Sequence, residues 1–408
     1  MVFLTYNGTM QRKAVAKPAS YVLPYAWVIL AVVFLASVVA PFNQFKIPPI
    51  MPVLMQAFHI DLTQAGVLMS IVAMIGLVLA LPAGILLQRF GAKLVGLIAL
   101  GCLAVGAGLG AQSLNYPGLL GSRVVEGIGM GLIGVAAPAT IAMWFPAERQ
   151  GMPMGIWATW VPVGSVTVYN LAPLLAARFN WGSVWWVGAI FAVVMFLLYA
   201  VFVRQPPEPQ PDVSPGPVPA GLSHALSNRN IWLLALEFAC FNIALVGLST
   251  YYPTFLNEVR GYPLGRAAFL SSLATMLVIV SAPLAGWLSD RVGSRRLVFS
   301  LPFLGIAVLL LFPFHVVGWQ IPALMITQGL LVGAIPTATF TAAPEIMRKP
   351  HLAGLGLAVV LVGQYLGQLI APILFSQLAT SLGWAMAGYL MIPVCLLGFA
   401  SAWSIKIR

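Results

Sequence analysis

Four ionisable side chains lie within long apolar stretches of the sequence: Lys46, Arg123, Glu126 and Glu237. An ionisable group at the centre of a bilayer costs about 2.5 kcal/mol or more, and such groups commonly mark substrate or proton pathways. Lysine and arginine bind anions, whereas a carboxyl group removed from water favours its neutral, protonated form. These residue types predict anion binding coupled to proton transfer inside a membrane.

Lys46 belongs to a proline-interrupted segment, residues 41–52, which also contains Asn43 and Gln44. Prolines lack N–H donors and free nearby carbonyl groups, and irregular backbone at membrane depth is tolerated where it faces protein or a water-filled cavity. One interpretation places these three polar side chains in such a cavity, where they bind substrate. The alternative is that Lys46 extends along its aliphatic stem to the membrane surface.

Arg123 and Glu126 are three residues apart, which places them on one face of a helix. Arg123 is expected at a depth similar to that of Lys46. Two cations in one low-dielectric cavity repel each other unless a negative charge lies between them, and we expect Glu126 to neutralise only one of them. The surplus charge predicts a small anionic substrate, bound by the Arg123 fork and the Lys46 ammonium. The alternative is that Arg123 and Glu126 form a structural pair.

Two carboxyl groups are candidates for proton coupling, Glu126 and Glu237, although Glu237 is equally explained as a neutral, hydrogen-bonded buried acid. Other mid-span polar and aromatic residues are candidates for lining a substrate path, but each also suits an interhelical hydrogen bond or packing. These are Trp157, Trp160, Asn242, Gln328, Gln364, Tyr365 and Gln368. Aromatic residues near the outer ends of the spans predict an interfacial belt. These are Tyr251, Tyr252, Trp181, Trp185 and Trp186.

The elements that hold these side chains are predicted to be membrane-spanning helices. Of the 408 residues, 61% are apolar and only 7% are charged, against about a quarter charged in soluble proteins. Continuous apolar runs of about 20 residues favour helices over barrel strands. We expect twelve spans, near 24–57, 63–86, 92–111, 117–142, 152–176, 182–203, 230–255, 265–286, 296–316, 320–343, 354–378 and 383–405.

The distribution of lysine and arginine predicts the orientation of these spans. Fifteen of the 20 basic residues fall on the side that holds both termini, whereas Arg178, Arg260 and Arg266 fall on the other side. By the positive-inside rule, both termini are cytoplasmic and the protein lies in the cytoplasmic membrane. The net charge of +11 therefore reflects topology and contact with lipid headgroups, and predicts no nucleic-acid partner.

A proline-rich connector divides the chain into two parts. Residues 204–220 contain seven prolines, which favour an extended, solvated segment. We expect an N-terminal six-helix half at 1–203, a cytoplasmic linker at 204–229 and a C-terminal six-helix half at 230–408. Short sequences recur at near-constant offset: Glu126-Gly127 matches Gln328-Gly329 after 202 residues. This repetition indicates two halves of similar fold with a substrate path between them.

The same offset separates two glycine-punctuated basic loops, Gly84 to Lys93 and Gly286 to Arg296. These loops resemble those between helices two and three and between helices eight and nine of major facilitator superfamily transporters. The Arg123-x-x-Glu126-Gly127 sequence resembles the fourth-helix Arg-x-x-Gln-Gly pattern of that family. Together with the twelve spans, the resemblance covers essentially the whole chain. It implies an all-α integral membrane fold of twelve helices in two six-helix pseudo-repeat halves.

In the family, these loops latch helices together in one state of alternating access. The resemblance assigns that role to Gly84, Gln88, Arg89, Gly91, Lys93, Gly286, Asp290, Arg291, Gly293, Arg295 and Arg296. Gln88 replaces the expected aspartate and forms no ion pair, so the first latch should be weaker or differently built. The alternative for the basic residues is simple anchoring on the cytoplasmic side. Short segments at 154–157 and 181–186 are similar to the cyanate and nitroimidazole branch of the family.

The resulting prediction is a secondary active transporter that moves a small anion by alternating access, as a monomer and with protons as the coupling ion. The main alternative is an exporter of amphipathic drugs or metabolites, in which methionine and tryptophan side chains bind the substrate. A passive channel is disfavoured because a fixed pore does not require two halves that move relative to one another. The sequence contains no metal-ligand spacing, nucleophile constellation or phosphate-binding loop, which disfavours an enzyme and predicts no cofactor.

Overall fold

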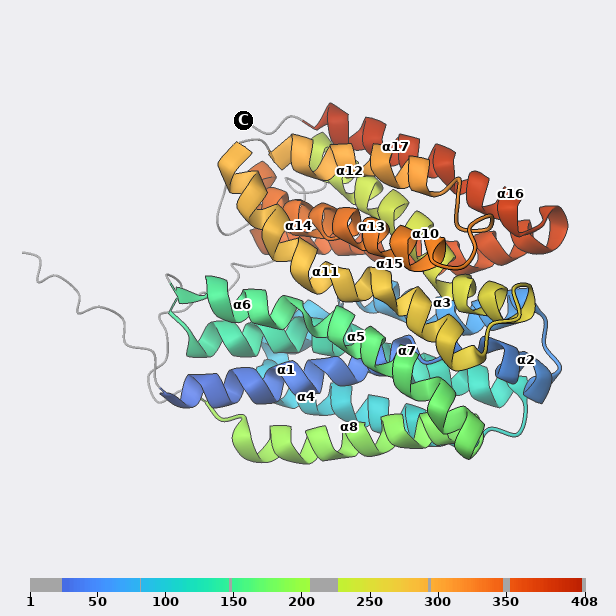
Figure 1. Ribbon diagram of the computed structural model, residues 1–408. Coiled ribbons are helices and arrows are strands. Elements are labelled where there is room, and N and C mark those ends of the chain that lie inside the picture. The colour runs from blue at the N-terminus through green and yellow to red at the C-terminus, as the bar shows by residue number, and fades with distance from the viewer. Residues whose placement is uncertain are drawn as a thin grey trace, which may run out of the picture.

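The computed structural model describes residues 24–80, 82–146, 149–205, 227–292, 295–347 and 353–405. Their helices run roughly side by side in two groups, which occupy the lower and upper parts of Figure 1. The N-terminal half contains α1 (Pro24–Gln44), the 3₁₀ helix η1 (Pro48–Ile50), α2 (Met51–Phe58), α3 (Leu62–Leu79), α4 (Pro82–Ala111), α5 (Tyr116–Trp144), α6 (Gly151–Ala158), α7 (Trp160–Arg178) and α8 (Gly182–Phe202). The C-terminal half contains α10 (Arg229–Glu258), α11 (Leu264–Val292), α12 (Arg295–Leu309), α13 (Gln320–Val332), α14 (Ala334–Met347), α15 (Ala353–Leu382), α16 (Trp384–Tyr389) and α17 (Met391–Ser404).

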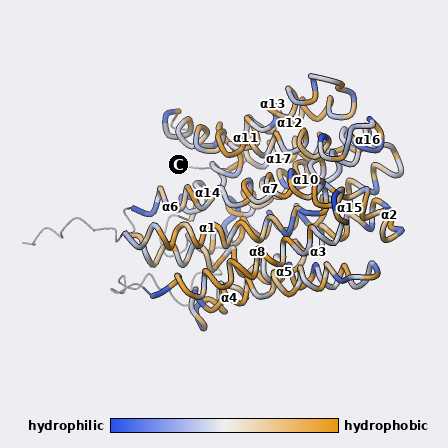
Figure 2. The backbone as a smooth tube through the Cα atoms, turned by 60° about the horizontal axis from the view of Figure 1, so that its bottom comes forward, coloured by the Kyte–Doolittle hydropathy of each residue, from blue (hydrophilic) through white to orange (hydrophobic). Residues whose placement is uncertain are grey.

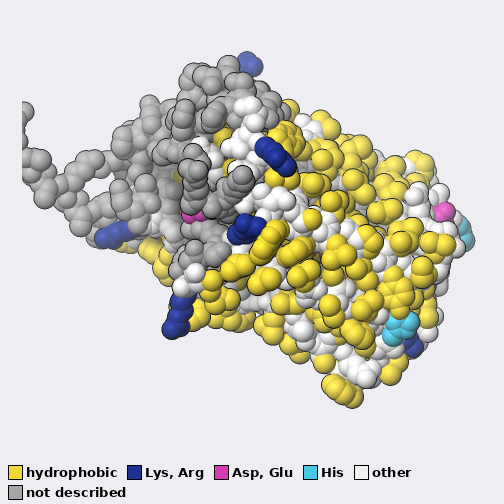
Figure 3. Space-filling view, turned by 90° about the horizontal axis from the view of Figure 1, so that it is seen from above, with side chains coloured by type: hydrophobic (Ala, Val, Ile, Leu, Met, Phe, Trp, Pro, Cys, Tyr) yellow, Lys and Arg dark blue, Asp and Glu magenta, His cyan; other side chains and the backbone are white. Residues whose placement is uncertain are grey.

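Eleven of these helices or joined helix pairs are long and apolar enough to cross a membrane, among the residues described. The twelfth predicted span, 296–316, corresponds to α12, an apolar helix of 15 residues. Hydrophobic residues predominate along the helices in Figure 2, and apolar side chains cover much of the face seen in Figure 3. Most lysine and arginine side chains visible on that face lie towards one end. The predicted all-α membrane fold is confirmed.

The first predicted span, 24–57, consists of three consecutive elements. The α-helix α1 ends at Gln44, and η1 and α2 follow after a short turn. The prolines at 48, 49 and 52 explain this change, since each removes a backbone N–H donor that a continuing helix requires. The loop predicted between residues 86 and 92 contains fewer non-helical residues than expected. The helix that begins at Pro82 runs up to Gly91, where φ is 76° and ψ is 160°, and the chain reverses there.

The start of α3 follows local capping chemistry. The Asp61 side chain accepts a hydrogen bond from the Gln64 backbone N–H at 2.7 Å, and the Gln64 side chain accepts one from the Asp61 N–H at 3.0 Å. This capping box satisfies N–H groups that have no partner within the helix.

The two halves meet through a limited set of helices. In the described part of the chain, α3 packs against α15, α7 packs against α11, and η1 contacts α10 and α11. We refer to the two ends of the bundle by the short helices that lie there in Figure 1, as the α2 end and the α6 end. The predicted linker falls largely on 206–226, outside the residues described.

Replacing Gly363 with alanine is expected to destabilise the protein by about 1–3 kcal/mol, because overpacking a dense contact costs about this much. Gly363 and Gly367 form a GxxxG sequence on α15, where small residues allow close helix approach. A Cβ atom at position 363 would overlap the backbone carbonyl group of Ala235 on α10. Thermal unfolding in detergent measures the effect. Gly354→Ala is the matched control on the same helix, since a Cβ atom there meets nothing within 4 Å. Equal melting temperatures for the two variants would contradict this account.

Candidate functional site

The end of α1 presents two backbone carbonyl groups that lack helical partners. A helical carbonyl accepts a hydrogen bond from the N–H four residues later. For Gln44 that residue is Pro48, which has no N–H, and for Asn43 it is Ile47, which lies beyond the end of the helix. The carbonyl end of a helix also carries partial negative charge. The sequence therefore builds an acceptor site for a cation at the end of α1.

Arg123 of α5 occupies this acceptor site. Its guanidinium donates to the carbonyl oxygens of Asn43 at 2.6 Å and Gln44 at 2.9 Å. Its Nε–H donates to the Leu68 carbonyl oxygen of α3 at 3.1 Å, and Nη1 also bonds to the Glu126 carboxylate. Four of the five guanidinium N–H groups thus have protein partners. Arg123 joins α1, α3 and α5 within the N-terminal half.

Lys46 lies on the other side of Glu126. Its ammonium is 2.6 Å from Glu126 Oε1 and 3.0 Å from the Asn43 side-chain oxygen. It also lies over the Trp185 ring, 4.4 Å from the centroid, in a cation–π contact. The Lys46 side chain has 0% exposure, so it does not extend to the membrane surface. We call Lys46, Arg123 and Glu126 the charge cluster.

The charge cluster differs in one respect from the sequence-based expectation. We expected Glu126 to neutralise only one cation, but its two oxygens divide between Lys46 and Arg123. The interaction is possible because the turn that follows Gln44 at the end of α1 places Lys46 against α5, a path that linear spacing does not specify. With all three groups ionised, the cluster carries one net positive charge in a site excluded from water.

A chain of side-chain amides connects the charge cluster to the C-terminal half. Gln44 Nε2 donates to Gln368 Oε1 of α15 at 3.2 Å, and Gln368 Nε2 donates to Asn242 Oδ1 of α10 at 3.3 Å. The Asn242 amide then donates to the Phe238 carbonyl oxygen at 2.8 Å. The structure therefore brings Asn43, Gln44, Gln368 and Asn242 together with the charge cluster. We call Gln44, Gln368 and Asn242 the amide chain.

Tyr251 closes a contact between the halves towards the α2 end. Its hydroxyl donates to the Pro372 carbonyl oxygen at 2.7 Å and lies 3.5 Å from the Leu62 carbonyl oxygen of α3. Tyr169 of α7 donates to the Ser249 carbonyl oxygen of α10 at 2.9 Å. The Tyr169–Ser249 bond and the Tyr251–Leu62 contact join the two halves, whereas the Tyr251–Pro372 bond lies within the C-terminal half. The first two must break if the halves separate at this end.

The other predicted path residues lie apart from the charge cluster. Trp157 and Trp160 form a stacked pair, with ring centroids 5.5 Å apart, and Trp157 donates to the Ser37 hydroxyl. Ser37 lies about 10 Å before Gln44 along the axis of α1. Tyr365 packs against Gly76 of α3, while Gln364 is half-buried and has no hydrogen bond recorded within the described region.

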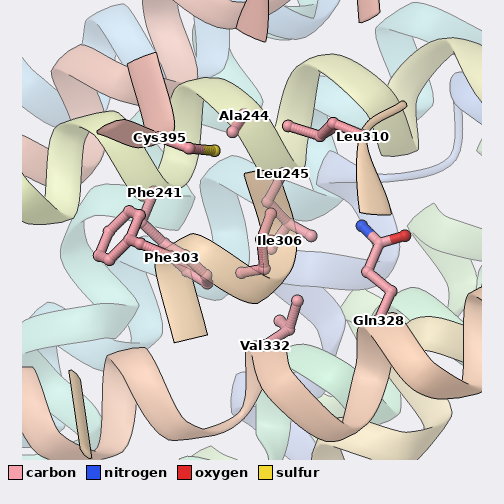
Figure 4. Close-up of a pocket in the computed structure, with 9 residues that line it drawn as sticks. All are labelled: Phe241, Ala244, Leu245, Phe303, Ile306, Leu310, Gln328, Val332 and Cys395. Carbon is pink, nitrogen blue, oxygen red and sulfur yellow. The ribbon is translucent and has the colours of Figure 1, made fainter. Parts of the chain in front are cut away.

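Gln328 lines a small internal cavity of the C-terminal half, shown in Figure 4. The cavity is about 10 Å³, which holds at most one water molecule, and its other lining side chains, such as Phe241 and Cys395, are apolar or weakly polar. This cavity is too small for an organic solute. Gln328 therefore does not join the charge cluster in this conformation.

Glu237 is buried within the C-terminal half. One carboxyl oxygen accepts a hydrogen bond from Thr339 of α14 at 3.1 Å, and the other has no partner among the described residues. Within the same residues, no hydrogen bond or ion pair joins Glu237 to the charge cluster. The two carboxyl groups predicted for proton coupling thus occupy separate environments.

The predicted latch residues lie towards the α6 end. Gln88, Arg89 and Lys93 are exposed, and Gly84 has open space where a Cβ atom would lie. Arg291 lies over the Trp287 ring, Arg296 lies over the Trp403 ring, and Gly286 is close to Thr337. Gly293 lies outside the described residues, as do the side chains of Asp290 and Arg295. A latch between helices therefore stays a prediction.

Sequence reasoning missed three groups near the site. Trp185 and Tyr251, predicted to belong to an interfacial belt, are fully buried, as is Tyr252, whereas Trp186 is exposed as expected. The Leu68 carbonyl group was not identified either. A tryptophan and a tyrosine near a span end suggest the interface only when they face lipid, and the sequence does not specify helix rotation well enough to decide this.

The fold and the buried charges define a multi-pass membrane protein with two helical halves and a polar centre. The chain belongs to the Major Facilitator Superfamily, whose sequence model matches residues 33–354 and 267–407. A bacterial homologue of the human lysosomal transporter Spinster, in an inward-facing and unoccupied conformation, has the same fold, with a TM-score of 0.78 at 14% identity over 93% of this chain and 96% of that one. Membership of the cyanate branch stays a prediction.

Several curated relatives carry names of anion transporters. The chloroplastic ascorbate transporter of Arabidopsis thaliana is 24% identical, over 71% of this chain and 56% of that protein. The hexuronate transporter of Bacillus subtilis is 21% identical, over 65% and 64%, and the probable nitrate/nitrite antiporter NarK1 of Thermus thermophilus is 26% identical, over 79% and 74%. The chain thus spans little more than half the length of the ascorbate transporter.

Proposed function

We propose that this protein is a secondary active transporter that moves a small anionic solute across the cytoplasmic membrane by alternating access, coupled to protons. The observation that carries the proposal is the charge cluster, in which two buried cations share one carboxylate. Family membership and the names of the relatives support a transporter of small anions rather than an enzyme. A single chain supplies all three charged groups, which is consistent with a monomer.

Charge balance explains how an anion and a proton would bind together. Protonation of Glu126 removes its negative charge and weakens its bonds to Lys46 and Arg123. A monovalent anion then takes its place between the cations, and the net charge of the site stays at one positive unit. Binding either the proton or the anion alone would change that charge in a low-dielectric environment, which is costly. Simultaneous binding therefore favours symport.

Lys46 is the cation that an incoming anion would use first. Its ammonium has only two hydrogen-bond partners and a ring contact, whereas the Arg123 guanidinium has four protein acceptors, three of them backbone carbonyl groups. In the proposed mechanism Arg123 holds the end of α1 in place and supplies positive potential. Lys46 and the one free N–H of Arg123 then contact the solute directly.

The amide chain supports coupling between the site and the movement of the halves. Gln44 contributes its carbonyl group to Arg123 and its side chain to Gln368, so a change at the charge cluster reaches the C-terminal half through one residue. Opening at the α2 end also requires loss of the Tyr251–Leu62 contact and of the Tyr169–Ser249 hydrogen bond. We propose that solute binding shifts the equilibrium between conformations closed and open at the α2 end. We also propose that both termini lie on the cytoplasmic side.

Transport by purified protein in liposomes tests the proposal. Labelled monocarboxylates, sugar acids, nitrate and sulfonates are offered with and without an inwardly directed proton gradient, in which the outside is more acidic than the lumen. We expect gradient-driven accumulation of at least one anion and faster entry when the liposomes are preloaded with the unlabelled anion. Equal entry with and without preloading would indicate a channel. Movement of neutral amphipathic compounds, with no anion transported, would favour the exporter.

A further inference from the structure

A second polar site lies at the α6 end of the N-terminal half. A cavity of about 100 Å³ opens between the break in α4, the end of α5 and the residues that follow α8. A single water needs about 10–15 Å³ by this measure, so the cavity accommodates a polyatomic group. Its lining includes Lys93, Arg204, Thr140 and Trp144. We call it the Lys93–Arg204 pocket, and none of its residues belongs to the charge cluster.

The pocket is held in shape by specific contacts. Gly91 adopts a φ of 76°, which favours glycine, and this reversal brings Lys93 beside the end of α5. Trp144 Nε1 donates to the Arg204 carbonyl oxygen at 3.2 Å, and the Tyr25 hydroxyl donates to the Phe202 carbonyl oxygen at 2.7 Å. These bonds fix the chain where it leaves α8. The pocket is therefore a built feature of the fold.

The pocket has unbalanced positive charge. Among the residues that the structure describes, its lining contains Lys93 and Arg204 and no acidic residue. Both side chains are exposed, and neither forms an ion pair with another described residue. The Thr140 hydroxyl and the Trp144 indole N–H already donate to the carbonyl oxygens of Ala136 and Arg204, so the two basic side chains are the donors that the pocket offers to a ligand. This combination suits a phosphate group, which accepts charge-assisted hydrogen bonds from lysine and arginine.

An apolar surface continues from the pocket towards the middle of the bundle. Leu94 and Ile98 of α4 are 46% and 43% exposed, and Val201 and Leu197 of α8 are 59% and 57% exposed. The two helices pack against each other and are largely hydrophobic along their length (Figure 2). In a membrane protein such side chains face lipid tails. The ligand that fits both regions has a charged head and an apolar body.

We propose that the Lys93–Arg204 pocket binds one anionic phospholipid, with its phosphate between Lys93 and Arg204 and its acyl chains along α4 and α8. The same phosphate chemistry is available from inorganic phosphate, but a free ion makes no use of the apolar surface. Basic residues at a membrane surface attract anionic lipids, and the walls of a pocket add a fixed position. The bound lipid would hold the α4 break against the end of α8.

Native mass spectrometry of the purified protein with added phosphatidylglycerol or phosphatidylcholine tests this site. The variant Lys93→Gln/Arg204→Gln removes both charges, and Arg89→Gln/Arg291→Gln is the control. Arg89 and Arg291 are exposed at the same end but do not line the pocket. We expect one tightly bound phosphatidylglycerol, weakened about tenfold in the pocket variant and unchanged in the control.

Three results would overturn the proposal. Equal loss in both double variants would indicate diffuse attraction to basic residues rather than a pocket. Unchanged phosphatidylglycerol binding in the pocket variant would place the lipid elsewhere. Displacement of the lipid by millimolar inorganic phosphate, with phosphate itself retained by the protein, would identify a free-phosphate site. Thermal unfolding of both variants checks that the fold is intact, and the side chains removed are exposed in each case.

Discussion

Replacing Lys46 with methionine is expected to weaken binding of the transported anion about 30-fold, which corresponds to about 2 kcal/mol for a buried charged contact. Methionine preserves the length of the side chain but removes its charge. Glu126 keeps Arg123 as a partner, so the remaining cluster is neutral and no longer attracts an anion. Thermal stabilisation by the anion, measured as a function of its concentration, gives the change in Kd.

The choice of Lys46 rather than Arg123 keeps this experiment interpretable. Arg123→Ala would leave carbonyl groups of Asn43, Gln44 and Leu68 without their donor, and the loss of fold would hide any loss of binding. Arg178→Gln is the control, since Arg178 is an exposed cation at the end of α7. If Lys46→Met binds and transports the anion with unaltered Kd, the charge cluster is only structural.

The positions of the spans and of the buried charges followed from the sequence because both depend on local composition. An apolar run of sufficient length is a helix in a bilayer whatever its neighbours are, and an ionisable residue within it needs a partner. Lys46, Arg123 and Glu126 could therefore be selected together before the structure was known. The capping box at Asp61 is equally local, since an aspartate followed three residues later by glutamine is enough to form it.

The partners of these charges could not be predicted, because they depend on helix rotation and on the path of irregular backbone. The turn after Gln44 places Lys46 against Trp185, a residue 139 positions later that had been assigned to the membrane interface. The orientation of α8 decides whether Trp185 faces lipid or protein. Similarly, Tyr251 reaches the Pro372 carbonyl only because α10, α3 and α15 converge.

The sequence made both Glu126 and Glu237 candidates for proton coupling, and the structure places them in separate environments. Glu126 is bonded to both cations that the proposed mechanism uses, whereas Glu237 contacts Thr339 inside the C-terminal half. A proton on Glu126 changes the affinity of the anion site directly. A proton on Glu237 would have to act through α10, which also carries Asn242 of the amide chain. We therefore propose Glu126, rather than Glu237, as the coupling group.

Replacing Glu126 with glutamine is therefore expected to abolish proton-driven accumulation of the anion while leaving counterflow measurable. Glutamine mimics the protonated acid, so the cations stay available to the anion, but the site no longer takes up a proton. With one coupled proton, a gradient of one pH unit supports about tenfold accumulation in the native protein, and the variant should show none. Accumulation and counterflow are measured in the same liposomes.

Two further variants make the result specific to Glu126. Glu258→Gln removes an exposed carboxylate at the end of α10 and should accumulate the anion normally. Glu237→Gln removes the other buried acid and should also accumulate it, since Glu237 has no bond to the charge cluster. If Glu237→Gln alone loses accumulation and keeps counterflow, proton coupling resides in the C-terminal half. The amide chain would then be the physical connection through which that proton acts on Lys46 and Arg123.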